Sequence, residues 1–276
     1  MTTERTAEGT HPHALRFRVT ISVLVGIASA ALAIAVIVLA DHAGTSAAVS
    51  GPAWSAWAPN SSGSEGVSEI AAHLAPYYRA SAAQQLDVIT PVAVAQTTAA
   101  GTTTGSGLTI AVNSSPAGKA QSLGLLNGET VAYNICGLGA KSCELAGTAS
   151  TDRLLLLRRE ALELALYTLK YIPHSQNVVV VLPPGRTVSS GGSGTTGRPV
   201  TVAVAFVRKE LAPWLAVPLT RTLAQYPPEL PQLTMWSRTA EAGFVDQVTA
   251  GALFSSQVEA QQVGGKLLVL SQLPPQ

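Results

Sequence analysis

The chain has 276 residues, a formal net charge of +1 and only 12% charged residues, against about 25% in typical soluble domains. This near-neutral balance, without a basic cluster or an acidic run, argues against nucleic acids and other charged polymers as partners. The length is sufficient for one or two domains with a substantial core.

An uncharged apolar segment, residues 19–40, predicts a single membrane-spanning helix. At about 1.5 Å per residue it would extend about 33 Å, which fits a hydrocarbon layer of about 30 Å. Arg16 and Arg18 precede the segment, and no Lys or Arg follows it until Arg79. Because positively charged flanks stay in the cytoplasm, we expect residues 1–18 to form a cytoplasmic tail and the rest to lie outside the membrane.

The competing interpretation of this segment is a cleaved signal peptide, with Val38, Leu39 and Ala40 as its cleavage signature. The apolar core of a signal peptide is usually about 7–15 residues long, and this one is longer. The length therefore favours a retained anchor, and both interpretations place the remaining chain outside the cytoplasm.

Small residues recur within the predicted membrane helix. Ser22, Gly26 and Ala30 are four residues apart and would share one face. Such a stripe lets two helices approach closely, which would allow a homo-oligomer. An Ala-rich helix also produces this spacing by chance, so the stripe permits self-association without requiring it.

Residues 41–66 are rich in Gly, Ser, Ala and Pro and predict a flexible tether between the membrane and a domain at 67–276. Trp54 and Trp57 interrupt this composition. They would contact lipid headgroups, as Trp does at membrane interfaces, or dock on the domain.

Residues 67–87 are expected to form a helix or a pair of helices, with a new turn at Pro76. Two segments dominated by Gly, Ser and Thr, residues 97–107 and 185–199, predict flexible loops.

Five segments are expected to form strands. Alternating apolar residues or β-branched runs mark residues 88–95, 108–112, 130–135, 177–182 and 200–207. The last two are almost wholly apolar, which is typical of strands buried on both faces, and they are expected to pair as a hairpin with a long loop.

The clearest helix is predicted over residues 153–172. Ser150 and Asp152 supply N-cap chemistry, the run is dense in Leu, Ala, Glu and Arg, and Pro173 ends it.

Residues 210–225 predict a helix interrupted by Pro213 and Pro218, and the chain after the next proline-rich turn is expected to form strands, the last at 266–270. This order predicts an α+β fold with a mixed sheet packed by helices.

Cys136 and Cys143 are the two cysteines of the chain. An even number of cysteines in an extracytoplasmic domain predicts a disulfide, which would close a short loop and contribute about 2.5 kcal/mol in the chain-entropy model. A metal site or redox catalysis is disfavoured, because no His lies nearby in the sequence and no C-x-x-C motif is present.

The helix at 153–172 places its leucines and alanines on one broad face, at about 100° per residue. Arg159, Glu160, Glu163 and Lys170 are expected on the opposite face, with Arg159 and Glu163 spaced for an ion pair. Arg158 is the exception, because it falls within the apolar face, where a guanidinium is rarely tolerated without a partner.

Arg158 is therefore the candidate residue for binding a ligand or a partner protein. The alternative is a structural ion pair, with Asp152, Glu129 or Glu144 as expected partners, or a side chain that reaches past a sheet edge.

The search for catalytic motifs gives nothing specific. His42, His73 and His174 form no metal-binding pattern, and the Gly-Ser-Gly stretches lie in the predicted loops rather than on a strand-to-helix turn. No pair of carboxylates is singled out for hydrolysis. We therefore expect no catalytic activity, no metal and no cofactor.

Two parts of the chain resemble known sequences: residues 136–184, especially 156–172 followed by 178–184, and residues 206–213. They are similar to uncharacterised single-pass membrane proteins of high-GC actinobacteria. The resemblance covers about half of the chain and implies a bacterial cell envelope, but those proteins supply no catalytic residue.

Together these features predict a membrane-anchored interaction or scaffold domain outside the cell membrane, with the lipid bilayer and membrane proteins as partners. The alternatives are a ligand-binding or sensor domain and, last, an envelope hydrolase.

Overall fold

The computed structural model describes residues 54–98, 102–114, 122–139, 143–145, 147–184, 186–188, 198–260 and 265–273. They belong to one compact unit, which runs from Pro52 to Gln276. The predicted membrane segment, residues 19–40, lies outside the described residues. None of the helices that are described combines the length and apolar character needed to cross a bilayer.

The predicted α+β fold with a mixed sheet is confirmed. Nine strands among the described residues form one sheet in the order β3-β8-β9-β11-β12-β13-β6-β7, with β10 beside β11. The pairs β8–β9 and β13–β6 are parallel, and the others are antiparallel. Their bounds are β3 Asp87–Val92, β6 Leu108–Asn113, β7 Leu123–Leu125, β8 Thr130–Gly137, β9 Asn177–Val181, β10 Arg186–Val188, β11 Arg198–Val207, β12 Leu253–Ala260 and β13 Lys266–Gln272.

The sheet curls so far that its first strand meets its seventh. The chain that follows β3 forms a parallel bridge from Val94 to Leu108 at the start of β6. Two hydrogen bonds hold the contact: the Leu108 amide donates to Ala93 O at 2.8 Å, and the Ala95 amide donates to Leu108 O at 3.1 Å. The sheet therefore has a convex face and a concave face, and a small core fills the closed end of the concave face, made of Ile110, Ala132, Val179, Ala203, Leu268 and Leu270.

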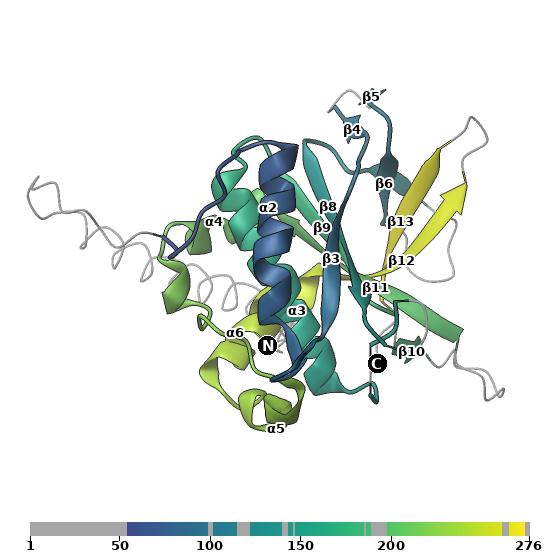
Figure 1. Cartoon of the computed structure of the whole chain (residues 1–276). Coiled ribbons are helices and arrows are strands. Elements are labelled where there is room, and N and C mark those ends of the chain that lie inside the picture. The colour runs from purple at the N-terminus through teal and green to yellow at the C-terminus, as the bar shows by residue number, and fades with distance from the viewer. Residues whose placement is uncertain are drawn as a thin grey trace, which may run out of the picture. The chain divides into compact units, whose positions relative to one another are not determined.

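Helices gather on one face of the sheet (Figure 1) and form the main core against it. These helices are α2 Ser64–Leu74, α3 Thr151–Tyr171, α4 Arg208–Leu215, α5 Leu233–Trp236 and α6 Ala240–Thr249, with 3₁₀ turns η1 Ala75–Tyr77, η2 Leu219–Arg221, η3 Leu230–Gln232 and η4 Ala250–Ala252. The sheet contributes Tyr133, Val178, Val180, Val204 and Phe206 to this core.

Helix α3 has the predicted position and cap. The side chain of Ser150 accepts a hydrogen bond from the amide of Arg153 at 3.1 Å, which satisfies one of the free amides at the helix start. The helix connects the parallel neighbours β8 and β9, so it must cross one face of the sheet.

The surroundings of α3 differ from the prediction. Arg159, Glu160 and Glu163, which were expected on an exposed face, are buried. The reason is that α2, α4, α5 and α6 also pack around α3. The middle of α3 therefore has no solvent face, and its charged residues are buried there, whereas Lys170 near its end is exposed as predicted. The predicted ion pair between Arg159 and Glu163 is confirmed at 2.8 Å.

The chain between the proline-rich turn and β12 also differs from the prediction. We expected strands, but α5 and α6 occupy this stretch before β12 and β13 begin. Thr239 starts α6 by accepting a hydrogen bond from the amide of Ala242 at 3.3 Å. The buried residues Ala242, Val245 and Thr249 follow at helical spacing, a pattern that the sequence already contained.

The predicted tether extends too far along the chain, because α2 begins at Ser64. Trp54 packs edge-on against Tyr167 and Tyr171, with ring centroids 5.5 and 5.7 Å apart. Trp57 stacks on His73 at 3.9 Å. Of the two alternatives for these tryptophans, the structure shows docking on the domain.

The predicted flexible loops are partly structured. Within the first, β4 Gln96–Thr97 pairs with β5 Thr103–Thr104. Within the second, β10 pairs with β11, and residues 189–197 lie outside the described part. The turn expected at Pro76 is the 3₁₀ turn η1, which is followed by the small hairpin of β1 Arg79–Ser81 and β2 Gln84–Gln85.

Arg159 connects the helical layer. Its guanidinium is 0% exposed and donates to Tyr78 Oη at 2.7 Å, to Glu163 Oε2 at 2.8 Å, to Glu241 Oε1 at 2.8 Å and to Ala224 O at 2.6 Å. These acceptors come from the chain after α2, from α3, from α6 and from the segment between η2 and η3. One side chain thus joins four separate parts of the chain.

Replacing Arg159 with Met should lower the free energy of unfolding by about 3–5 kcal/mol, because two carboxylates would lose their buried counter-charge. Arg159→Lys should also destabilise, since one ammonium group cannot reach four acceptors in different directions. Thermal unfolding followed by circular dichroism measures both effects. Arg238→Met, at an exposed position, is the control, and equal effects from Arg159→Met and Arg238→Met would contradict the assigned role.

Candidate functional site

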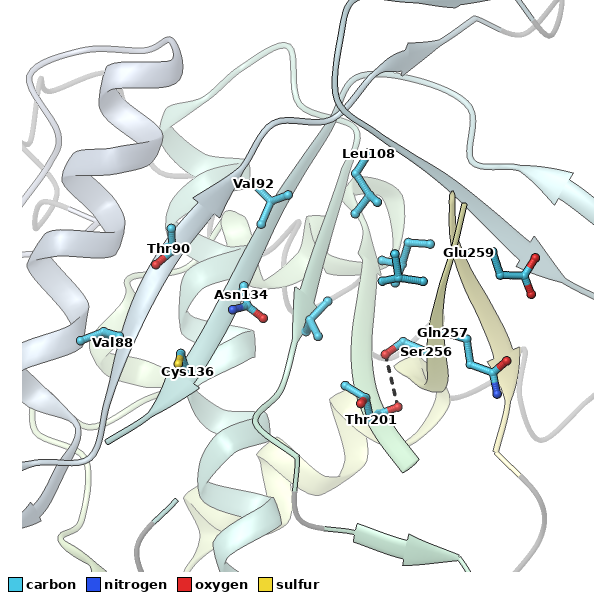
Figure 2. A pocket seen from close by; sticks show the side chains of 13 residues that line it. Val88, Thr90, Val92, Leu108, Asn134, Cys136, Thr201, Ser256, Gln257 and Glu259 are labelled. Atoms are coloured by element: carbon cyan, nitrogen blue, oxygen red, sulfur yellow. Dashed lines mark hydrogen bonds between the residues drawn. The ribbon is translucent and has the colours of Figure 1, made fainter. Parts of the chain in front are cut away.

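The open end of the concave sheet face holds a cavity of about 850 Å³, which we call the hollow. Figure 2 shows its lining side chains, which come from strands on both sides of the opening. Thr90 of β3 and Asn134 of β8 lie on one side, and Ser256 and Glu259 of β12 lie on the other.

The alternation of side chains along each strand creates the hollow. In β8, Asn134 and Cys136 line the hollow, whereas Tyr133 and Ile135 enter the helical core. Successive side chains of a strand point to opposite faces, so a strand between two layers serves both of them. The helices cover only the convex face, and the concave face is left open where the sheet does not close.

The lining of the hollow is aliphatic and neutral polar. Val92, Val181 and Leu268 alternate with hydroxyl and amide side chains, and Glu259 is the one charged residue among the described lining. The hydroxyl of Ser256 donates a hydrogen bond to the carbonyl oxygen of Thr201, at 3.2 Å. Since no basic side chain of the described residues lines the hollow, these residues offer no counter-charge to a phosphate or a carboxylate.

Two aliphatic side chains lie exposed at the hollow. Val88 of β3 is 39% exposed and Val258 of β12 is 61% exposed. Both also line the cavity, so apolar surface continues from the floor of the hollow to its mouth. Contiguous exposed apolar surface of this kind commonly marks an interaction site.

No family model, no curated protein and no solved structure matches this chain.

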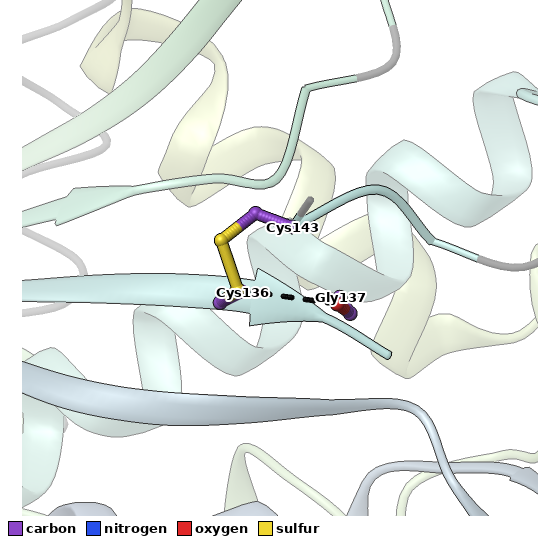
Figure 3. The surroundings of a disulfide bond; sticks show 3 residues. All are labelled: Cys136, Gly137 and Cys143. Carbon is purple, nitrogen blue, oxygen red and sulfur yellow. Dashed lines mark hydrogen bonds between the residues drawn. A yellow bond between two sulfur atoms is a disulfide. The ribbon is translucent and has the colours of Figure 1, made fainter. Parts of the chain in front are cut away.

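The predicted disulfide between Cys136 and Cys143 is present (Figure 3). It ties the end of β8 to the loop that leads towards α3. The loop passes so close to Gly137 that a side chain would not fit, because a Cβ there would lie 2.4 Å from Glu144 O. The Gly137 amide also donates a hydrogen bond to Cys143 O at 3.1 Å. Since Cys136 lines the hollow, the disulfide also fixes one end of that cavity.

Replacing both Cys136 and Cys143 with Ser should lower the free energy of unfolding by about 2–2.5 kcal/mol, because the unfolded chain regains the entropy of the closed loop. Chemical denaturation with and without a phosphine reductant measures the effect. The reductant should destabilise the parent chain by a similar amount and leave the double variant unchanged. A reductant effect on the double variant would show that the change does not come from this disulfide.

Arg158 lies at the interface of α3 and α6. Its Nε donates to Thr249 Oγ1 at 2.7 Å, and its Nη2 donates to Asp246 O at 2.9 Å and lies 2.8 Å from Asp246 Oδ1. The carboxylate partner is therefore Asp246 and not Asp152, Glu129 or Glu144 as expected, because α6 was not predicted. Arg158 does not line the hollow, which is on the other face of the sheet.

The sequence did not single out the carboxyls of Asp87 and Glu160, which meet between β3 and α3. Both residues are 0% exposed. None of their four carboxyl oxygens accepts a hydrogen bond from a donor in the described residues, and each carboxyl has the other as its neighbour. Burial raises the pKa of Asp87 to about 7. Burial and the nearby Asp87 charge raise the pKa of Glu160 well above its usual value. A proton held between the two carboxyls supplies the missing hydrogen bond.

This pair predicts that stability falls as the pH rises. Both carboxyls titrate near 4 in the unfolded chain, whereas in the folded chain Asp87 keeps its proton until about pH 7. Between these values the unfolded chain binds fewer protons, so the free energy of unfolding should decrease by about 2–4 kcal/mol from pH 4 to pH 8. Asp87→Asn should flatten this decrease, as measured by denaturation across the pH range.

Glu259→Gln, which removes an exposed carboxyl, is the matched control and should leave the pH profile unchanged. A parent chain that is equally stable from pH 4 to pH 8 would contradict the shared proton.

No three His, Cys, Asp or Glu side chains of the described residues are placed to hold a metal ion. Asp87 and Glu160, the adjacent carboxyls, are enclosed and cannot reach a substrate. The described lining of the hollow is aliphatic and neutral polar apart from Glu259, a composition suited to binding.

Proposed function

We propose that this protein is a membrane-anchored interaction domain of the bacterial cell envelope, and that the hollow binds an uncharged, largely apolar segment of a partner membrane protein. The observation that carries the proposal is the hollow itself, a cavity of about 850 Å³ with an apolar floor and exposed valines at its mouth. A buried core of a protein interface has this composition, with few charges and many aliphatic contacts.

The lining argues against other ligand classes. Anionic ligands would meet Glu259 and no basic residue among the described lining. The hydroxyl and amide groups of Thr90, Asn134 and Thr201 can hydrogen-bond a peptide backbone from the side. A neutral polypeptide segment would pack its apolar side chains on the aliphatic lining and hydrogen-bond the polar groups through its backbone.

Recognition is expected through side chains in the hollow rather than through an added strand. β3 is an edge strand of the sheet, but Pro91 lies within it and has no amide to donate. Proline is a common device against edge-to-edge pairing. The face of β3 is therefore a better binding surface than its edge.

Two features support the location. The apolar segment 19–40 predicts an anchor with the domain outside the cytoplasm. The disulfide between Cys136 and Cys143 is typical of oxidising compartments.

Site-specific photo-crosslinking in native membranes tests the proposal. A benzophenone side chain at Val258, in the lining of the hollow and on the same face of β12 as Ser256, should give one discrete adduct with a membrane protein. The same probe at Thr234, exposed on α5, should not. Thr201→Trp, which fills the hollow, should abolish the Val258 adduct, and Thr234→Trp is the matched control.

The thermal unfolding of both Trp variants must equal that of the parent chain, so that loss of the adduct reports on the hollow and not on the fold. An adduct that survives Thr201→Trp, or equal adducts from both probe positions, would overturn the proposal.

A further inference from the structure

A second cavity, of about 320 Å³, lies in the helical layer, and we call it the aromatic cavity. It is bounded by residues before α2, by α2 and α3, and by the segment that contains η2. It shares no lining residue with the hollow. Its volume is at the lower end of the range for small-molecule sites, about 300–1,000 Å³.

Aromatic rings form one side of this cavity. Trp57 and His73 stack on each other at 3.9 Å, and Tyr167 lies 5.8 Å from Trp57 between ring centroids. Tyr77 adds a fourth ring, 5.3 Å from His73. All four residues line the cavity. The faces of aromatic rings carry partial negative charge and attract cations.

A carboxylate lies in the same lining. Glu163 is 6% exposed, and its Oε2 accepts hydrogen bonds from Tyr78 and Arg159 at 2.7 and 2.8 Å. Its Oε1 receives no hydrogen bond from the described residues. Glu241 is the other carboxylate that binds Arg159, and both of its oxygens accept hydrogen bonds. Its Oε1 accepts from Arg159 and from the Ala224 amide, and its Oε2 accepts from the indole of Trp236. Oε1 of Glu163 is thus the one open acceptor of this cluster.

The charges around this oxygen do not balance. The single guanidinium of Arg159 faces the two carboxylates of Glu163 and Glu241. An excess negative charge in a buried place is costly unless a cation compensates it. The aromatic cavity is where such a cation has room.

We propose that the aromatic cavity binds an organic cation, a methylated ammonium group held between the aromatic rings and Glu163. The ring faces suit the methyl groups, and the open carboxylate oxygen neutralises the charge. A bare metal ion is less suited to this cavity, because Glu163 is the one carboxylate in its described lining and no three His, Cys, Asp or Glu side chains of the described residues are placed to hold a metal. A free small cation and a lipid headgroup carry the same chemistry.

Calorimetric titration of the full chain in a maltoside detergent tests this site. Choline is the probe for a free ligand, and dihexanoylphosphatidylcholine is the probe for a lipid headgroup. The neutral isostere 3,3-dimethylbutan-1-ol has the shape of choline without its charge. Choline or the phospholipid should bind at least about tenfold more tightly than the isostere, because the charge is the recognised feature.

Glu163→Gln should weaken choline binding by about tenfold or more, since it removes the charge and keeps the shape. Because Glu163 also pairs with Arg159, a second variant outside the ion-pair cluster is required. Trp57→Leu serves this purpose, and Trp214→Leu, at a ring that packs on Phe244 instead, is the matched control. Thermal unfolding checks that each variant is folded.

If choline binds more tightly than the phospholipid, the ligand is a free small cation. If the phospholipid binds more tightly, the ligand is a lipid headgroup. The proposal would be overturned by equal affinity for choline and the neutral isostere, or by no binding to the parent chain. A methyl glucoside is the probe for a neutral sugar, and its binding in place of both cations would also overturn the proposal. Unchanged affinity in folded Trp57→Leu would also overturn it.

Discussion

A guanidinium buried without solvent contact organises the helical layer of this domain. Arg159 is held by Tyr78, Glu163, Glu241 and the carbonyl of Ala224, so four stretches of chain must be in place together. Such a charge is tolerated only when its donors are satisfied, and its partners are tolerated only while it is present. The arrangement of helices on the sheet is therefore specified by directional bonds as well as by apolar packing.

The curl of the sheet separates two kinds of surface. Its convex face is covered by helices and its concave face is open, and each strand supplies both faces by alternation. The two cavities consequently differ in chemistry. The hollow is neutral and aliphatic, whereas the aromatic cavity contains ring faces and an open carboxylate. The two proposed ligands, an apolar polypeptide and a small organic cation, would therefore bind on different sides of the sheet.

The sequence was informative where the pattern is local. Helix α3 with its Ser150 cap, the buried strands β9 and β11, and the disulfide were all predicted from composition and spacing. The exposure of Arg159 was predicted wrongly, because helical periodicity assumes a solvent face along the whole helix and the middle of α3 has none. The partner of Arg158 was missed with α6 itself. Neither cavity could be predicted, since each gathers residues from strands or helices far apart in the chain.

Pairing of Cys136 with Cys143 accounts for every cysteine of the sequence, so the native protein offers no free thiol. A single cysteine introduced by mutagenesis would then be a unique handle for a spin label or a fluorophore. Val258 is a suitable position, since it lines the hollow from β12 and is exposed. The mobility of one label at this position would report when the hollow fills, whatever molecule fills it.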